Sequence, residues 1–345
     1  MHEALADSRV VDPFGIASDA VFPGIAHALD PNVMAQRFGE MPSLAPSGAA
    51  IEVQAIRVVR HKPGRRCLIE YDLLERKPGG RPQPITLIGK VRARHSPRGA
   101  YRLLSKFWHA GFDYDSPDGI SVPEPIGWFA DLAMWLQRKV SGRPASALLA
   151  GPGAIELMSR IAEAAHKIHE AQIPAVRAHT LADELRILRE HLPKVALRSQ
   201  GWQVRIERLL QACARFGGSI PEPAACGIHR DFYPDQLIVD GRQLTVVDFD
   251  LYCRGDIGVD IGNFLGHSIE QALRDTGDPG AYQALAAAME ERFFALAGNE
   301  ARLSVAAYTD LTLVRHIYLS TLFEARRPLT GTLLELCEQR LKRWL

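Results

Sequence analysis

Two short apolar segments around a turn, each joined to an aspartate, constrain this chain more than any other feature. The first segment, residues 224–228, leads to Asp231, and a second apolar run follows at 237–239. After the turn Asp240-Gly241-Arg242 comes another strand-like run, which ends at Asp248, twelve residues beyond Gln236. Apolar runs bounded by turn residues predict strands. Two strands around one turn would bring both carboxylates to one place.

Two carboxylates with an amide oxygen nearby are equipment for phosphoryl transfer. One carboxylate accepts or orients the proton of an attacking hydroxyl, and the other holds magnesium against nucleotide phosphates. Asp231 is therefore the candidate catalytic base. Asp248 and Gln236 are candidate metal ligands, because Mg²⁺ prefers oxygen ligands. The simpler alternative is ordinary loop chemistry, since Asp favours turns.

The run His229-Arg230-Asp231-Phe232-Tyr233-Pro234-Asp235-Gln236, followed by Asp248-Phe249-Asp250, resembles a known catalytic signature. It is similar to that of the aminoglycoside phosphotransferase and choline kinase family, small-molecule relatives of protein kinases. That family has His-x-Asp-x-x-x-x-Asn, then an Asp after a strand, and a further Asp about a dozen residues on, here Asp260. The helix that ends in His166-Lys167-Ile168-His169 and the strand near 134–140 resemble further family elements. The resemblance covers roughly residues 50 to 325.

The resemblance implies an α+β, protein-kinase-like bilobal fold with a small antiparallel β lobe and a larger, mostly helical lobe. We expect an N-terminal extension at 1–48, a nucleotide-binding lobe at 49–141 and a helical catalytic and substrate-binding lobe at 142–345, with the active site between the lobes. The hydrophobic patterns agree with this division. They predict strands near 53–59, 67–73, 85–91, 124–129 and 134–140. They predict helices near 31–40, 97–110, 155–171, 181–192, 203–216, 260–274, 279–297, 301–324 and 330–344.

The resemblance also assigns roles outside the two strands. Lys90, at the end of an apolar strand, would contact the α- and β-phosphates of ATP. Gln137, Arg138 and Lys139 would meet the adenine through backbone groups. His229 and Asp260 would support the catalytic loop; for Asp260, capping of its helix is the alternative. His166 and His169, three apart on a helix, are expected to pack at the helix end rather than to bind a metal.

Three departures from the family pattern bear on function. The helix after Lys90 carries no acid to pair with it between residues 96 and 108, which leaves Glu70 and Glu52 as open candidates. The turn at residues 60–66 has one glycine, so arginine side chains could replace backbone amides as phosphate ligands, since Arg pairs with phosphate; a basic exposed hairpin is the alternative. Gln236 stands where the family has Asn.

Charge is balanced overall but not locally. The net charge is +1, whereas residues 51–110 hold fourteen basic and four acidic residues. A basic small lobe suits nucleotide phosphates, and an acidic helical lobe mildly favours a cationic acceptor.

The leading function is an ATP- (or GTP-) and Mg²⁺-dependent kinase that phosphorylates a hydroxyl of a small molecule, such as an aminoglycoside, sugar or amino alcohol. A pseudokinase-like nucleotide-binding module is the alternative, and a nucleic-acid binder is weakly supported because no recognition motif accompanies the charges.

Five scattered cysteines form no C-x-x-C pair and predict neither a zinc site nor a disulfide framework. A reducing cytoplasm is the setting that such cysteines favour. Acidic residues near the N-terminus, without an apolar segment, predict no signal peptide. No apolar run approaches a membrane span. The expected partner is a small-molecule acceptor, with no nucleic acid and no membrane.

Overall fold

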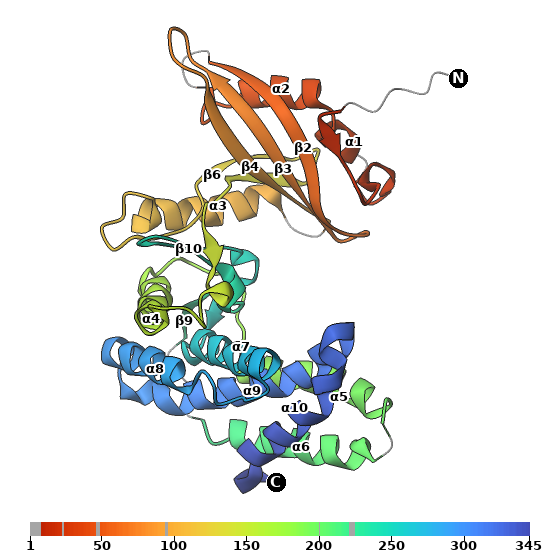
Figure 1. The fold of residues 1–345 in the computed structure, drawn as a ribbon, viewed down its shortest axis with the longest axis vertical. Coiled ribbons are helices and arrows are strands. Elements are labelled where there is room, and N and C mark those ends of the chain that lie inside the picture. Colours follow the sequence, from red (N-terminus) through yellow and green to blue (C-terminus); the bar gives the residue numbers. More distant parts are fainter. Residues whose placement is uncertain (1–7, 23, 46–48, 94–95, 200, 221–224) are drawn as a thin grey trace. The chain divides into compact units, whose positions relative to one another are not determined.

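The computed structural model describes residues 8–345 except 23, 46–48, 94–95, 200 and 221–224 (Figure 1). The first seven residues, on which the signal-peptide prediction rests, and Ala224 of the apolar lead-in lie outside the described residues. The chain divides into two compact units, Met1–Ser141 and Gly142–Leu345.

The first unit is built on a six-stranded sheet with the order β1-β2-β3-β4-β7-β6. The five neighbours β2, β3, β4, β7 and β6 pair antiparallel, as the alternating patterns predict, and β1 lies parallel to β2. The strands are β1 (Val10–Val11), β2 (Ala50–Lys62), β3 (Arg66–Arg76), β4 (Gln83–Arg92), β6 (Pro125–Phe129) and β7 (Met134–Arg138), with β5 (Ile120–Ser121) apart from this sheet.

The two faces of this sheet have different characters because side chains alternate along each strand. One face packs against α1 (Ile25–Ala28) and α2 (Pro31–Gly39), where Phe38 and Tyr71 meet edge to face at 5.2 Å. Residues assigned to an N-terminal extension thus share the core of this unit. Asp30 caps α2, accepting bonds from Asn32 N and Val33 N. Figure 1 shows α3 (Pro97–Phe107) on the opposite side of the sheet from α2.

The second unit is mostly helical, as the spacing of apolar residues predicts. Its helices are α4 (Ala154–Glu170), α5 (Leu181–Ala196), α6 (Trp202–Gly217), α7 (Gly258–Thr276), α8 (Gln283–Ala297), α9 (Arg302–Leu322) and α10 (Thr330–Arg340). Two small antiparallel sheets interrupt them: β8 (Arg143–Pro144), β10 (Leu237–Asp240) and β11 (Gln243–Val246) in one, β9 (Cys226–Ile228) and β12 (Cys253–Gly255) in the other. No helix in the described part of the chain has the length and apolarity to cross a membrane.

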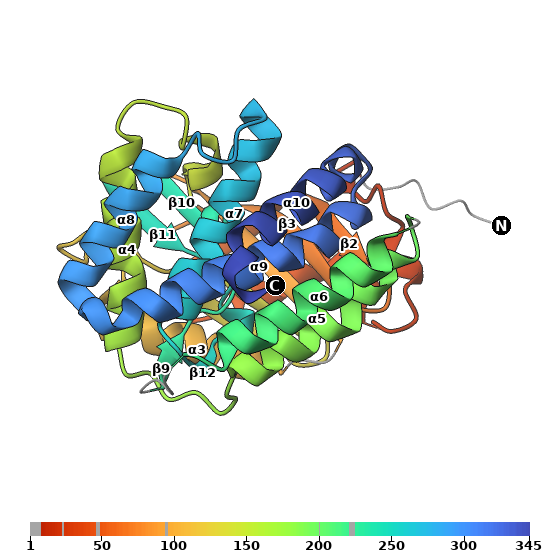
Figure 2. The same cartoon turned by 90° about the horizontal axis from the view of Figure 1, so that it is seen from below.

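Helices α7 and α9 pack side by side, and glycines permit their close approach (Figure 2). Gly258, Gly262 and Gly266 recur every four residues, on one face of α7. A Cβ atom at Gly262 would lie 2.6 Å from the backbone nitrogen of Thr309, and one at Gly266 would lie 2.6 Å from the Thr312 side chain. Polar residues extend from this contact to the loop around Asp231: Asn263 of α7 bonds to Phe232, and Arg315 of α9 bonds to Asn263.

Candidate active site

The predicted strand–turn–strand unit is present and brings Gln236 and Asp248 together. In the β10–β11 ladder Leu237 pairs with Val246, and just beyond it the Val247 N–H donates to the carbonyl oxygen of Gln236 at 2.9 Å. Gln236 therefore lies beside the segment that ends in Asp248. The amide group of Gln236 also donates through Nε2 to Asp231 Oδ2 at 3.3 Å, which joins the candidate base to this group.

Two residues of the site adopt backbone conformations that L-amino acids rarely take. Arg230 has φ +69° and Asp248 has φ +68°, both in the left-handed region. Such conformations are unfavourable and persist only where the surroundings impose them. They occur here immediately before Asp231 and at Asp248 itself, so the fold holds both carboxylates in defined positions.

Asp260, the third residue of α7, holds the loop before Asp231. Its carboxylate accepts hydrogen bonds from the backbone N–H of His229 at 2.9 Å and from that of Arg230 at 2.6 Å. His169 Nε2 from α4 makes a third contact with it, at 2.9 Å. Both side chains are almost fully buried, so these bonds are protected from water. His169 packs at the end of α4, and within the described residues no group of three or more His, Cys, Asp and Glu is placed to hold a metal.

His229 joins the two halves of the site. Its Nε2 lies 3.0 Å from the carbonyl oxygen of Val247, so that nitrogen carries the proton and donates it. The ring is fully buried and packs edge to face against Phe249 at 4.7 Å and Phe232 at 5.8 Å. This environment ties the backbone before Asp231 to the backbone before Asp248.

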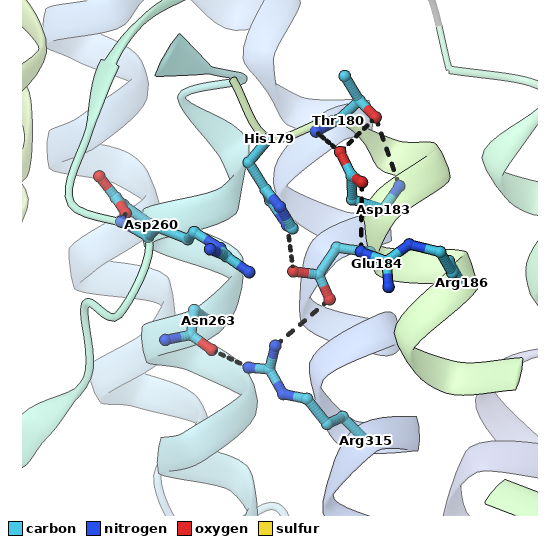
Figure 3. A network of polar contacts seen from close by, with 9 residues as sticks. His179, Thr180, Asp183, Glu184, Arg186, Asp260, Asn263 and Arg315 are labelled. Atoms are coloured by element: carbon cyan, nitrogen blue, oxygen red, sulfur yellow. Dashed lines mark hydrogen bonds and ion pairs between the residues drawn. The ribbon is translucent and has the colours of Figure 1, made fainter. Parts of the chain in front are cut away.

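A buried polar chain that the sequence analysis did not identify continues from the loop into the helices (Figure 3). Asn263 Nδ2 of α7 donates to the carbonyl oxygen of Phe232 at 3.0 Å, and its Oδ1 accepts from Arg315 of α9. Arg315 Nη1 also donates to Glu184 Oε2 of α5 at 3.3 Å, and Glu184 Oε1 lies 2.6 Å from His179 Nε2. Burial opposes the ionisation of Glu184, but Arg315 and His179 lower its pKa to about 2. An arginine and a histidine at 315–316, directly between apolar residues, were the sequence signal for such a cluster.

In the first unit, Lys90 lies on β4 between β3 and β7. It pairs in register with Leu68 and Trp135, and its Nζ lies 5.8 Å from the centre of the Trp135 ring. The open candidates for its acidic partner are engaged elsewhere: Glu70 makes ion pairs with Arg57 and Lys139, both at 2.5 Å. Glu52 pairs with Arg76 at 3.1 Å.

The proposed adenine-binding residues lie at the end of β7. The backbone N–H of Arg138 donates to the Glu124 carbonyl, and that of Lys139 donates to the Thr86 carbonyl, each at 2.9 Å. Gln137 is buried within the sheet. Recognition of adenine through Arg138 or Lys139 would therefore use their carbonyl oxygens, since their N–H groups are already bonded.

The basic turn between β2 and β3 is held by a residue that the sequence analysis missed. Asp19 Oδ2 accepts from the Gly64 N–H at 2.9 Å and lies 2.8 Å from His61 Nε2. The Gly64 N–H, with the His61 ring, lowers the pKa of Asp19. Burial lowers the pKa of Lys62, and the neighbouring arginines, led by Arg66, lower it further. The turn thus gathers positive side chains while the amide of its one glycine is occupied.

A sheet unit followed by a helical unit that carries an aspartate-bearing loop defines the protein-kinase-like class of phosphotransferases. The sequence model of the phosphotransferase enzyme family matches residues 86–301, and the chain belongs to this family. No curated protein matches the sequence.

Solved structures show the same fold at low sequence identity. Aminoglycoside phosphotransferase APH(4)-Ia, as a thermostable mutant in ternary complex with ADP and hygromycin B, is 14% identical with a TM-score of 0.57, over 90% of this chain and 97% of that chain. A choline/ethanolamine kinase family protein from Mesorhizobium loti is 14% identical with a TM-score of 0.55, over 90% and 94%. Spectinomycin phosphotransferase APH(9)-Ia, in complex with ADP and spectinomycin, is 9% identical with a TM-score of 0.54, over 85% and 89%. The predicted family and fold class are confirmed.

Proposed function

We propose that this protein is an ATP- or GTP-dependent, Mg²⁺-dependent kinase that transfers the γ-phosphoryl group to a hydroxyl of a small molecule. The observation that carries the proposal is the loop held by Asp260, which fixes the backbone before Asp231 while Gln236 bonds to the Asp231 carboxylate. Family membership and the ADP-bound structural neighbours support it. The scattered cysteines support a cytoplasmic setting.

The residues expected to hold Mg²⁺ fit that ion by their chemistry. Asp248 offers carboxylate oxygens and Gln236 an amide oxygen, and Mg²⁺ is usually bound by one or two carboxylates together with water and phosphate oxygens. Gln236 Nε2 donates to Asp231, so the side-chain oxygen of Gln236 is the atom that would bind the ion. When bound, the ion would neutralise phosphate charge as it develops in the transition state.

Asp231 would orient the acceptor. The acceptor oxygen forms a bond to the γ-phosphorus while the bond from that phosphorus to the bridging oxygen of the β-phosphate breaks, and ADP or GDP leaves. The hydroxyl proton passes to the Asp231 carboxylate. Aspartate is a weak base, so its effect lies mainly in positioning the hydroxyl.

The first unit would hold the nucleotide. Lys90 would contact the α- and β-phosphates, and the carbonyl oxygens of residues 137–139 would accept a bond from the base. The basic turn around Lys62 would contact the phosphates through its positive side chains, because the Gly64 N–H is already bonded to Asp19. Arg side chains pair with phosphate through two parallel hydrogen bonds.

Asp231→Asn tests the proposal. The change removes the proton acceptor and the charge but keeps the shape, so we expect transfer to fall at least about a hundredfold, roughly 2.7 kcal/mol of barrier, with nucleotide affinity nearly unchanged. Product formation by mass spectrometry and nucleotide binding by calorimetry give the two readouts. Asp240→Asn, at the end of β10 on the same hairpin, is the matched control and should transfer normally. Wild-type turnover by Asp231→Asn would remove the catalytic role.

A binding module without turnover is the second candidate, and one observation favours it. The N–H of Gly64, the one glycine in the turn at residues 60–66, is already bound to Asp19 and is not offered to a phosphate. If a broad acceptor panel yields no phosphorylated product while ATP and Mg²⁺ bind, this alternative replaces the kinase.

A further inference from the structure

A second feature of the helical unit lies directly beside the proposed catalytic loop. A pocket of about 380 Å³ is lined by Tyr233, Pro234 and Asp235, which begin two residues after Asp231. Helices α7 and α9 and the segment after α9 supply most of the remaining wall. Small-molecule sites commonly measure roughly 300–1,000 Å³, so this pocket suits one small ring better than a linked set of rings.

A carboxylate with an unused oxygen lines this pocket. Glu270 of α7 is 2% exposed, and its Oε1 has no hydrogen-bond partner. Arg274 Nε lies 3.7 Å and Arg326 Nη1 lies 3.8 Å from that oxygen, close enough for charge attraction but beyond hydrogen-bond distance. A buried acceptor without a bond is costly, so this oxygen is suited to a donor from a ligand.

A histidine in the same wall has an unused nitrogen. His316 of α9 is 1% exposed, and its Nε2 has no hydrogen-bond partner. Its ring meets His267 edge to face at 4.4 Å, and His267 stacks on Tyr233 of the loop at 4.6 Å. Burial, with the neighbouring charge of Arg315, lowers the pKa of His316 to about 3. The ring is therefore neutral at pH 7, and it can exchange a hydrogen bond with a ligand without offering charge.

We propose that this pocket binds the acceptor of the proposed kinase and that the acceptor is a neutral polyhydroxylated ring, such as a sugar. This proposal rests on the proposed function only in that the bound ligand receives the phosphoryl group. A hydroxyl can donate to Glu270 and exchange a bond with His316. An ammonium group at Glu270 would be repelled by the two guanidinium groups that already neutralise this carboxylate. An anion near the same oxygen would be repelled by the carboxylate itself.

Matched sugars test the charge of the ligand. Glucose, galactose and mannose are compared with their 2-amino and uronic-acid counterparts by saturation-transfer NMR on the full chain. We expect at least one neutral sugar to bind at millimolar concentration and to bind several-fold more tightly than either charged counterpart. Tighter binding of an amino sugar or a uronate, or no binding by any neutral sugar, overturns the proposal.

Two variants then place the ligand in this pocket. Glu270→Gln should weaken the neutral sugar roughly threefold to tenfold, the difference between a hydrogen bond to a carboxylate and one to a neutral amide oxygen. It should improve binding of the uronate by leaving two arginines without a carboxylate. His316→Phe keeps an aromatic ring and should weaken the neutral sugar by a similar factor. Glu338→Gln, on α10 and in an ion pair with Arg205 of α6, is the matched control and should bind like wild type. Unchanged binding in both pocket variants overturns the proposal, and circular dichroism verifies that each is folded.

Phosphoryl transfer is measured separately, so that the two proposals fail differently. If Glu270→Gln loses binding of the neutral sugar while the wild-type protein forms no product from ATP, the result supports the pocket and counts against the kinase. Transfer to an amine-bearing acceptor, undiminished in Glu270→Gln, supports the kinase and overturns this inference.

Discussion

Among single residues, Gln236 departs most clearly from the family pattern and is the most direct to test. Its amide bonds to Asp231, and its oxygen is the proposed magnesium ligand. Gln236→Asn restores the shorter amide and should stay within about tenfold of wild-type kcat/KM, or exceed it. Gln236→Ala removes the ligand atom and should lose at least about a hundredfold, tenfold per 1.4 kcal/mol. Steady-state kinetics at varied Mg²⁺ measure both; equal rates in all three proteins would show that the amide does not touch the metal.

Asp260 tests the support of the loop independently of catalysis. In Asp260→Asn one acceptor oxygen becomes an NH₂ donor that faces other donors, so a buried N–H of His229 or Arg230 loses its partner. We expect the free energy of unfolding to fall by about 1–3 kcal/mol or more, measured by urea denaturation. Asp275→Asn, exposed on the same helix, is the control and should change it by less than about 0.5 kcal/mol. Equal stability of the two variants would contradict the structural role.

Between elements, the contact of α7 with α9 depends on the absence of side chains at three positions. Gly262→Ala places a methyl group 2.6 Å from Thr309 N and from the Tyr308 side chain, so the helices must separate. We expect a loss of about 1–3 kcal/mol of stability, as for other overpacked sites. Gly39→Ala, at the end of α2 with nothing near the new methyl, should be neutral or slightly stabilising. Thermal unfolding of both variants compares them; an equal response would mean that α7 and α9 are not in close contact.

The ion pair between Glu184 of α5 and Arg315 of α9 predicts that the free energy of unfolding depends on pH. The pKa of Glu184 falls from 4.5 to about 2 on folding, so its charged form stabilises the folded state. This stabilisation is fully present above pH 4.5 and is lost as the pH falls toward 2. The difference in unfolding free energy between wild type and Glu184→Gln should therefore be largest near neutral pH and shrink across that window. Urea denaturation at several pH values measures it, and a difference that is constant down to pH 2 would contradict the ion pair.

At the scale of the whole molecule, binding of the proposed nucleotide is expected to change the thermal stability. ATP with Mg²⁺ should raise the midpoint of thermal unfolding, because a ligand of the native state alone stabilises it by mass action. Asp248→Ala should lose the part of the shift that depends on Mg²⁺ and keep the part that ATP produces in EDTA. Calorimetry that detects no nucleotide binding at millimolar concentration, with folded protein, would count against the proposed function.

Local sequence was enough to predict the longer helices and strands, but not short elements such as β1, β8 and β12. The strands at 53–59, 67–73 and 85–91, the helix capped by Asp30 and the unit around the turn at 240–242 are all present. Each follows from side-chain periodicity and turn chemistry within a few residues, which a single sequence displays directly. The pairing of Gln236 with the segment before Asp248 follows as well, because one turn sets the register of a hairpin.

Only the tertiary structure decided which distant side chains meet. His169 and Asp260 are 91 positions apart and Glu184 and Arg315 are 131 apart, yet each pair is in contact. The bond of Asp19 to Gly64 and the pocket at Glu270 arise in the same way. Such contacts depend on how helices and strands pack, because periodicity specifies which face of an element is buried and not which neighbour covers it. The sequence by itself therefore determined the chemistry available to this protein, and the packing determined where that chemistry is held.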